Sequence, residues 1–259
     1  MNKTFLADMT WQEFQDALGP DTVVVIPMGS VELEGLHLPL GVDTIVAEGV
    51  ARELDGQEGV VIGPEIPMGY SKWFTPYPGT ITLEQDTLVR LLLDYCRSLV
   101  KHNVSRIVFL NAHKGNNAAI DTAAHTLIQD HGVKVGMLSV WKLANDLIDG
   151  KDLIAEGRFT HAGEIMTSLM LALRPETVVN SQIRADRVKP IKGSDFDPKN
   201  SLGDTGFRGV VQTVYQDIRN VTDTGVLGDP SAATVEKGRK LLEMIAEYAQ
   251  AFLQEFRRI

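Results

Sequence analysis

The sequence predicts an α/β protein with a mostly parallel sheet covered by helices on both faces. Short apolar, β-branched runs alternate with longer segments of helical periodicity, which is typical of strands joined through helices. The apolar runs are continuous, as in strands buried on both faces. Neither a linker nor an internal repeat divides the 259 residues. We therefore expect a single domain over residues 1–259.

The elements follow in chain order from these patterns. Strands are predicted at residues 22–27, 59–63, 106–111 and 134–140. Helices are predicted at residues 44–54, 83–102, 116–131, 162–173 and about 231–256. The Gly- and Asp-rich stretch 192–209 has no clear periodicity, so we expect a long excursion over the surface, as either a lid or a subunit contact.

Composition excludes several classes of partner. The formal net charge is −9 and Lys and Arg are not clustered, which argues against binding to nucleic acid. Hydrophobic residues make up 44% of the chain, but none of the apolar runs approaches the length of a membrane span. The N-terminus lacks the apolar core of a secretion signal, and the single cysteine, Cys96, excludes an intrachain disulfide. We expect a cytoplasmic protein.

An acidic loop follows the first predicted strand. Residues 27–43 contain Glu32, Glu34, His37 and Asp43 among turn-forming Gly, Ser and Pro residues. Open α/β sheets bind ligands at the carboxyl ends of their strands, so a site is expected here. Converging carboxylates raise each other's pKa, and a bound divalent cation would remove that cost. The alternative is a solvated acidic loop.

Two later segments contain further donors. His113 follows the predicted strand 106–111 and is either structural or a ligand beside the carboxylates. His161 and Glu164 precede a segment that turns apolar, as at a helix that begins at a site. The alternative for this segment is a capping arrangement, with Thr160 as the cap and Glu164 in the first turn.

Together these segments resemble the creatininase family. The motif Gly-Ser-x-Glu-Gln-His-Gly-x-His-Leu-Pro, followed by Asp, is matched by Gly29, Ser30, Glu32, Gly35, His37, Leu38, Pro39 and Asp43. The motif Asn-Gly-His-Gly-Gly-Asn is matched by Asn111, His113, Gly115 and Asn116, and His-Ala-Gly-Glu by residues 161–164. Residues 78–80 and 225–238 fit further elements. The resemblance spans most of the chain and implies a creatininase-like fold.

The resemblance implies a centre of two divalent metal ions, Mn²⁺, Zn²⁺ or Mg²⁺. Glu32, Asp43 and His113 would bind one ion, and Asp43 would bridge to a second ion held also by Glu164. Glu34 stands where the family usually has a ligand histidine. As a ligand it would favour Mn²⁺ or Mg²⁺ over Zn²⁺, since carboxylate is the harder donor.

Further roles follow from the same resemblance. His161 matches the family's proton-transfer histidine. His37 is either a ligand or a residue that orients the acidic loop and its ligands without binding the ion itself. The other residues expected to support the ligands or contact the substrate are Ser71, Trp73, Asn111 and Asn116.

The implied function is metal-dependent hydrolysis, in which a bridging hydroxide attacks the carbonyl of a C–N bond in a small cyclic amide or a formamide, as in a creatinine amidohydrolase. One alternative is C–C hydrolysis that opens a cyclic diketone such as 3-dehydro-scyllo-inosose. Another is a non-catalytic binding protein, which metal content would distinguish. The partner would be a small-molecule substrate, with neither nucleic acid nor membrane involved. The resemblance also suggests a homo-oligomer, commonly a hexamer.

Overall fold

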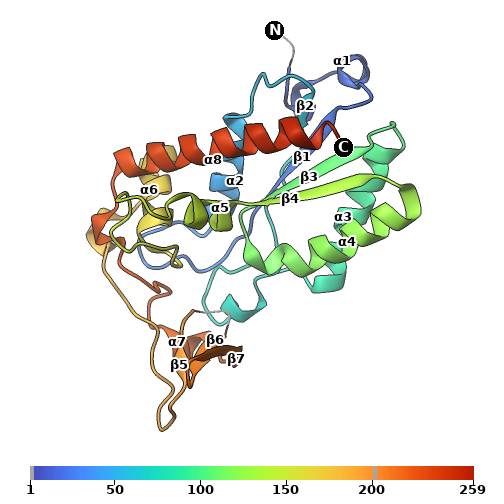
Figure 1. The fold of residues 1–259 in the computed structure, drawn as a ribbon. Helices are drawn as coiled ribbons and strands as arrows, with labels where there is room; N and C mark the ends of the chain where they lie inside the picture. The colour runs from blue at the N-terminus through green and yellow to red at the C-terminus, as the bar shows by residue number, and fades with distance from the viewer. Residues whose placement is uncertain (1–2, 201–202) are drawn as a thin grey trace.

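Four apolar runs form the central sheet of the computed structural model, which describes residues 3–200 and 203–259. The strands are β1 (Val23–Met28), β2 (Val60–Ile62), β3 (Arg106–Asn111) and β4 (Lys134–Ser139). They pair in parallel in the order β2-β1-β3-β4 (Figure 1). The strand order reverses between β1 and β3, because β2 is added on one side of this pair and β4 on the other, and open parallel sheets have a ligand-binding crevice at the carboxyl ends of the strands at such a point.

Both faces of the sheet are buried at β1, β2 and β3, which explains why these strands are continuous apolar runs, whereas the edge strand β4 is partly exposed. In β1, Val23 and Val25 belong to one hydrophobic cluster, whereas Val24, Ile26 and Met28 belong to the cluster on the opposite face. This alternation follows from the pleat, which points successive side chains to opposite faces. A sheet covered on both sides therefore needs no polar positions in its central strands.

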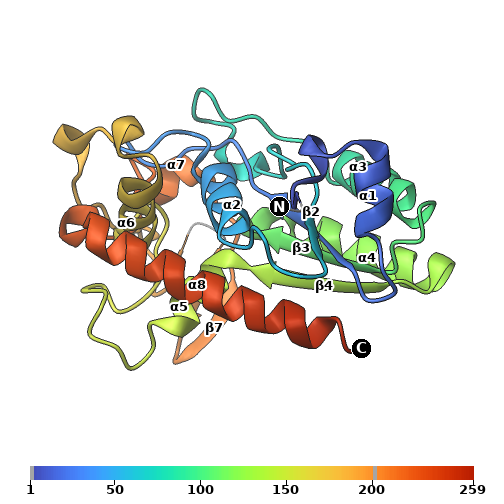
Figure 2. The same ribbon diagram turned by 90° about the horizontal axis from the view of Figure 1, so that it is seen from above.

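Helices cover each face. The helices that pack on the face of Val23 and Val25 are α2 (Val42–Arg52), α5 (Val140–Leu147), α6 (Glu164–Leu173) and α8 (Val235–Phe256). The opposite face is covered by α3 (Gln85–Val100) and α4 (Asn117–His131), with side chains of the short helix α1 (Trp11–Ala17) packed beside them (Figures 1 and 2). Cys96 is buried in this second layer. The predicted fold class is confirmed, and the domain bounds 1–259 stay a prediction.

Short 3₁₀ helices connect these elements. They are η1 (Leu6–Asp8), η2 (Lys72–Phe74), η3 (Lys114–Asn116), η4 (Pro175–Thr177), η5 (Asn180–Gln182) and η6 (Pro230–Ala232). In the described part of the chain, every helix is too short or too polar to cross a membrane.

The stretch that the sequence predicts as an excursion contains a small second sheet. Its antiparallel strands are β5 (Asp197–Pro198), β6 (Asp204–Phe207) and β7 (Val210–Thr213), followed by α7 (Ile218–Val221). Arg208 and Gly209 join β6 to β7 with φ angles of 48° and 82°, as a two-residue hairpin turn requires. This small antiparallel sheet lies beyond the carboxyl ends of the parallel strands β1–β4 (Figure 1).

Candidate metal centre

The predicted donors meet at the carboxyl edge of the central sheet. Residues 29–41 connect β1 to α2 and contain Glu32 and Glu34, while Asp43 lies in the first turn of α2. His113 follows β3 directly. Since β1 and β3 are neighbours in the sheet, the two loops that leave them converge. His161 enters from the loop that precedes α6.

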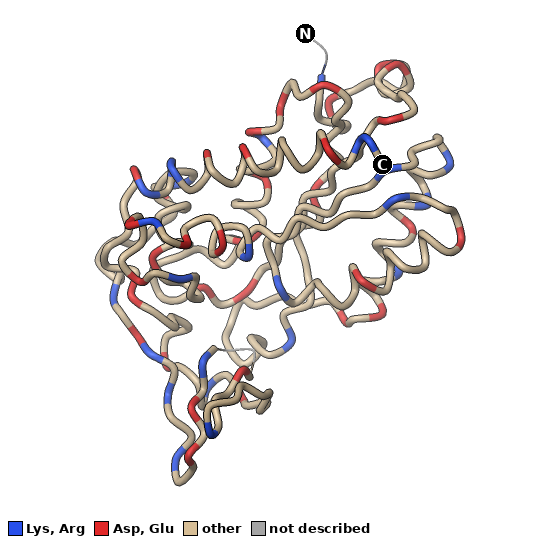
Figure 3. Tube along the Cα trace, in the orientation of Figure 1, with Lys and Arg blue, Asp and Glu red and all other residues tan. Residues whose placement is uncertain are grey.

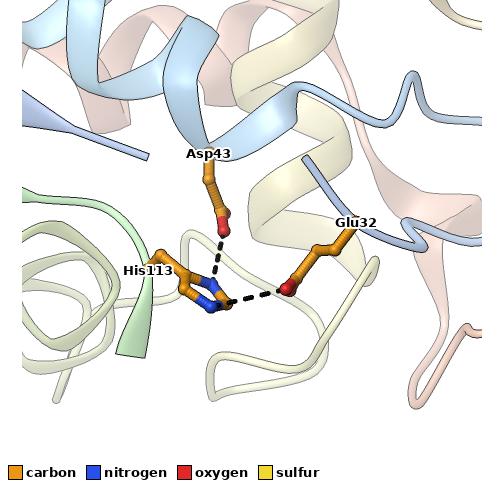
Figure 4. A group of neighbouring side chains, drawn as sticks. All are labelled: Glu32, Asp43 and His113. Atoms are coloured by element: carbon orange, nitrogen blue, oxygen red, sulfur yellow. Dashed lines mark hydrogen bonds and ion pairs between the residues drawn. The ribbon is translucent and has the colours of Figure 1, made fainter. Parts of the chain in front are cut away.

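Glu32, Asp43 and His113 form the first group of donors (Figure 4). His113 Nδ1 lies 2.9 Å from Asp43 Oδ2, and His113 Nε2 lies 3.4 Å from Glu32 Oε2. One donor atom from each of the three side chains fits within 4.8 Å of the others. All three residues are buried, as expected for groups that hold an ion away from bulk water.

Both ring nitrogens of His113 face acceptors. Nδ1 donates to Asp43, and Nε2 donates to the carbonyl of Tyr70 over 2.9 Å. Burial alone would lower the pKa of His113, but the charge of Glu32 and the hydrogen bond to Asp43 outweigh it and raise this pKa to about 9. The histidine therefore holds a positive charge that partly balances the carboxylates, and a divalent cation would take over that task.

Asp43 is held in place by two donors from other elements. Ser30 Oγ donates to Oδ2 over 2.8 Å, and Trp141 Nε1 donates to Oδ1 over 3.0 Å. Oδ1 keeps a further lone pair for a cation, whereas Oδ2 also accepts from His113 Nδ1. The orientation of the predicted bridging ligand is thus set before any ion binds.

Glu34 and His161 form a second group with Glu32. His161 Nε2 lies 3.6 Å from Glu34 Oε2 and donates to the carbonyl of Leu33 over 2.8 Å. Phe74 stacks on the imidazole, with ring centroids 5.0 Å apart. Burial lowers the pKa of His161, so the ring is neutral at pH 7 and its Nε2 proton points at Leu33.

The buried carboxylates have unpaired oxygens. Glu32 Oε2 and both oxygens of Glu34 lack hydrogen-bond partners in the described chain, although only 2% and 1% of these residues is exposed. Burial raises the pKa of Glu32 to about 7 and the pKa of Glu34 well above its usual value, with Asp43 adding to both shifts. Buried polar atoms without partners are costly. Metal ions would supply the missing partners, so this donor set fits a metal centre.

Glu164 lies apart from both groups. Its carboxylate accepts from Lys237 Nζ over 2.5 Å and from the backbone N–H of Glu156 over 3.0 Å. Glu164 belongs to neither donor group, and its role as ligand to the second ion stays a prediction. The predicted capping by Thr160 differs: its hydroxyl donates to Glu156, whose carboxylate accepts the N–H of Glu164 instead.

The residues expected around the ligands take different positions. Ser71 Oγ lies 3.3 Å from His113 Nε2. The Asn111 side chain donates to the backbone carbonyl of His113 and accepts from its backbone N–H. The Asn116 side chain donates to the Gly29 carbonyl and accepts from the backbone N–H of Tyr70. These three residues fix the histidine and the loops beside it.

His37 and Trp73 are farther from the donors. His37 Nε2 bonds Thr167 Oγ1 on α6 over 2.9 Å and belongs to neither donor group. Trp73 packs against Tyr70 and Phe74. Of the two roles left open for His37, support of the acidic loop therefore agrees better with its contacts.

A pocket of about 550 Å³ opens over the first donor group. Its walls include Phe74, Met137, Trp141 and Phe159, and its rim contains charged side chains from α5 and the loop that precedes α6. Trp141 and Phe159 are missing from the sequence prediction. Trp141 comes two residues after β4 ends, so its place at the carboxyl edge of the sheet is a signal that could have identified it.

The match to known proteins decides the family. The creatininase family model, described as creatinine amidohydrolase, matches residues 7–253. The chain belongs to the creatininase family. Creatinine amidohydrolase of Pseudomonas putida is 29% identical over 97% of this chain and 97% of its own length. Mycofactocin precursor peptide peptidase of Mycobacterium tuberculosis is 32% identical over 86% of this chain and 81% of its own.

Other members of the family extend the comparison. The 3-dehydro-scyllo-inosose hydrolase of Thermotoga maritima is 23% identical over 97% of this chain and 83% of its own length. A crystal structure of creatinine amidohydrolase (creatininase) superposes with a TM-score of 0.75 at 27% identity, covering 99% of each chain. A creatininase structure titled with Mn is 26% identical, with a TM-score of 0.75, and covers 97% of this chain and 98% of its own. This chain is thus a creatininase-family hydrolase.

Proposed function

We propose that this chain is a metal-dependent hydrolase that cleaves a C–N bond in a small cyclic amide or a formamide. The observation that carries the proposal is the set of buried, unpaired oxygens on Glu32 and Glu34 beside Asp43 and His113. A protein keeps such a cluster at high cost in free energy unless cations neutralise it. The pocket above it has room for a small molecule.

The ligand assignment in this proposal combines the first donor group with the bridging role predicted for Asp43. Glu32, Asp43 and His113 would hold one divalent ion, and Asp43 and Glu34 would hold a second. The ions, when bound, supply an activated water and polarise the substrate carbonyl. Mn²⁺, Zn²⁺ and Mg²⁺ all suit the mixed oxygen and nitrogen donors.

The protein's own residues would do the remaining work. Ser30 and Trp141 orient Asp43 through their hydrogen bonds, so little reorganisation is needed when charge develops. The carbonyl of Leu33 fixes the tautomer of His161 with the proton on Nε2. Because the ring is neutral, His161 would first take up a proton from the attacking water and would then deliver a proton to the leaving nitrogen as the C–N bond breaks. Phe74 and Trp141 exclude water from the walls of the pocket.

A C–N bond is preferred over a C–C bond because of the similarity to named relatives. The amidohydrolase and the peptidase are 29% and 32% identical to this chain, whereas the hydrolase of 3-dehydro-scyllo-inosose is 23% identical. The cytoplasmic location and the hexamer stay predictions of the sequence.

The test is turnover by Mn²⁺-loaded protein of a panel of lactams, cyclic ureas, formamides and diketo-cyclitols. Hydrolysis of any of the first three classes, with two ions bound per chain, supports the proposal. Turnover of the diketo-cyclitols alone would move the assignment to C–C cleavage. Fewer than one ion per chain in carefully refilled protein would point to a non-catalytic binding protein.

A further inference from the structure

The charges around the pocket change sign between its floor and its rim. The floor contains the carboxylates of Glu32 and Asp43. Apart from histidines, five other charged side chains line the pocket. Four of them are cationic, namely Lys114, Lys142, Arg158 and Lys199, and the fifth is the acid Asp146. The chain as a whole has 34 acidic and 25 basic residues, and the trace shows both signs spread over the molecule (Figure 3). The cationic rim therefore departs from the composition of the protein.

Two of the rim cations are already paired with acids. Lys142 forms an ion pair with Asp146, and Lys199 forms one with Asp197. Arg158 and Lys114 differ, because neither side chain has an ion-pair or hydrogen-bond partner within residues 3–200 and 203–259. Both are exposed at the rim. Their charges are thus free to meet a ligand.

Arg158 belongs to a segment whose position is fixed relative to the metal centre. The N–H of Phe159, the next residue, donates to Asn145 Oδ1 on α5 over 2.8 Å. The Phe159 ring stacks on Trp141, with centroids 5.2 Å apart, and Trp141 in turn donates to Asp43. A continuous series of contacts therefore leads from the Asp43 carboxylate through the rings of Trp141 and Phe159 to the neighbouring residue, Arg158.

Lys114 reaches the pocket from a different element. It follows His113 directly, at the start of η3, and the N–H of Asn117 bonds its backbone carbonyl. The two unpaired cations thus belong to separate segments that both line the pocket, one next to a ligand histidine and the other next to the aromatic wall. A ligand that reaches from the floor to the rim would meet an apolar middle and a positive end.

From this arrangement we infer that the substrate is an amide that bears a carboxylate on the side away from the scissile carbonyl, with an apolar group between the two. The inference rests on the proposed function for the reacting end of the substrate. Arg158 and Lys114 are the residues that select the carboxylate, since guanidinium and ammonium groups both donate to it. Trp141 and Phe159 contact the apolar group between the ends.

Two probes of the same shape test the inference: 4-(formamidomethyl)benzoate and its neutral amide, 4-(formamidomethyl)benzamide, in which an aromatic ring separates the formyl group from the other end. Mn²⁺-loaded protein should bind the acid about fivefold more tightly than the amide, the upper end of what one exposed ion pair contributes. The Kd is measured by calorimetry and compared with KM where turnover occurs. High salt should reduce the difference.

Variants separate the rim from the metal ions, since a carboxylate could also bind the ions. Arg158→Gln and Lys114→Gln should each reduce the preference for the acid, and Arg158→Lys should keep part of it. Lys101→Gln, at an exposed lysine after α3, is the matched control and should keep all of it.

The outcomes distinguish this inference from the proposed function. Equal binding of acid and amide, binding of neither, or a preference that survives both rim substitutions overturns the inference. If the acid is preferred and the rim variants lose that preference, but neither probe nor any amide in the panel is hydrolysed, the inference stands and the hydrolytic function fails.

Discussion

Glu34 stands where the resemblance predicts a ligand histidine, and both of its buried oxygens lack hydrogen-bond partners in the described chain. We predict that Glu34→His keeps the ions bound but shifts preference from Mn²⁺ toward Zn²⁺ on the order of tenfold, because imidazole is the softer donor. Competition titrations of Mn²⁺ against Zn²⁺ measure this shift. His37→Ala is the control, since His37 bonds Thr167 and lies outside both donor groups. An unchanged preference in Glu34→His, together with an ion lost from His37→Ala, would reverse the assignment.

Asp43 allows a second prediction at this scale. Asp43→Ala should abolish binding of at least one ion, because this carboxylate touches His113 and is the residue expected to bridge both ions. Elemental analysis of refilled protein gives the ion count. Asp94→Ala, which removes an exposed carboxylate on α3, should leave the count unchanged. Full metal content in Asp43→Ala would exclude a bridging role.

The sequence identifies the candidate donors of the metal centre better than it identifies the long-range contacts around them. Glu32, Glu34 and His113 could be proposed as candidate donors because they lie in the segments that leave β1 and β3, where parallel sheets place their sites, and Asp43 because it lies in the first turn of the helix that follows. The partner of Glu164 could not be predicted, because Lys237 is 73 positions away in the chain and the pair depends on how α6 packs against α8. Contacts of this kind require the tertiary structure.

At the scale of elements, the parallel strands were predicted to within a few residues, since strands buried on both faces appear as uninterrupted apolar runs. The sequence does not predict helix α5, because β4 leads into it without a turn and the apolar run continues to Val140. The β6–β7 hairpin was missed as well. Its turn uses Arg208 with positive φ, where sequence rules look for Asn or Asp.

The junction of α6 and α8 supports a prediction about stability. Lys237→Met leaves the Glu164 carboxylate buried without its cation and should cost roughly 3 kcal/mol of unfolding free energy. Urea denaturation measures the loss. The double variant Lys237→Met/Glu164→Gln should recover part of it, because no unpaired charge remains. If Lys237→Met unfolds at the same urea concentration as wild type, the ion pair contributes nothing to stability.

For the whole molecule, the donor cluster predicts how stability depends on pH when metal is removed by a chelator. The pKa of Glu32 rises from 4.5 to about 7 on folding, so its stabilising contribution is present below pH 4.5 and is lost as pH rises to about 7. The pKa of His113 rises from 6.5 to about 9, and its contribution is lost over that range. Both effects have the same sign.

Below pH 6.5 the pKa of His37, which burial lowers to about 4, has the opposite effect on stability. The Tm of chelated protein should therefore fall as pH rises from about 6.5 to about 9, and Mn²⁺ added at the alkaline end should raise it again. The Glu32 contribution alone is on the order of 3 kcal/mol, or roughly 5–10 °C in Tm. Glu32→Gln, which cannot ionise, should show a shallower fall. A flat profile in the chelated wild type would mean that the cluster is neutralised in some other way.

The strand order β2-β1-β3-β4 also has a consequence for how the protein matures. During synthesis the acidic loop after β1 leaves the ribosome well before β3. His113 reaches this loop only when β3 pairs with β1, after the whole of the chain between the two strands has been made. Long-range parallel pairings of this kind form slowly. We therefore expect the proposed ligand set to assemble late in folding, so that metal would load into the finished protein rather than into the nascent chain.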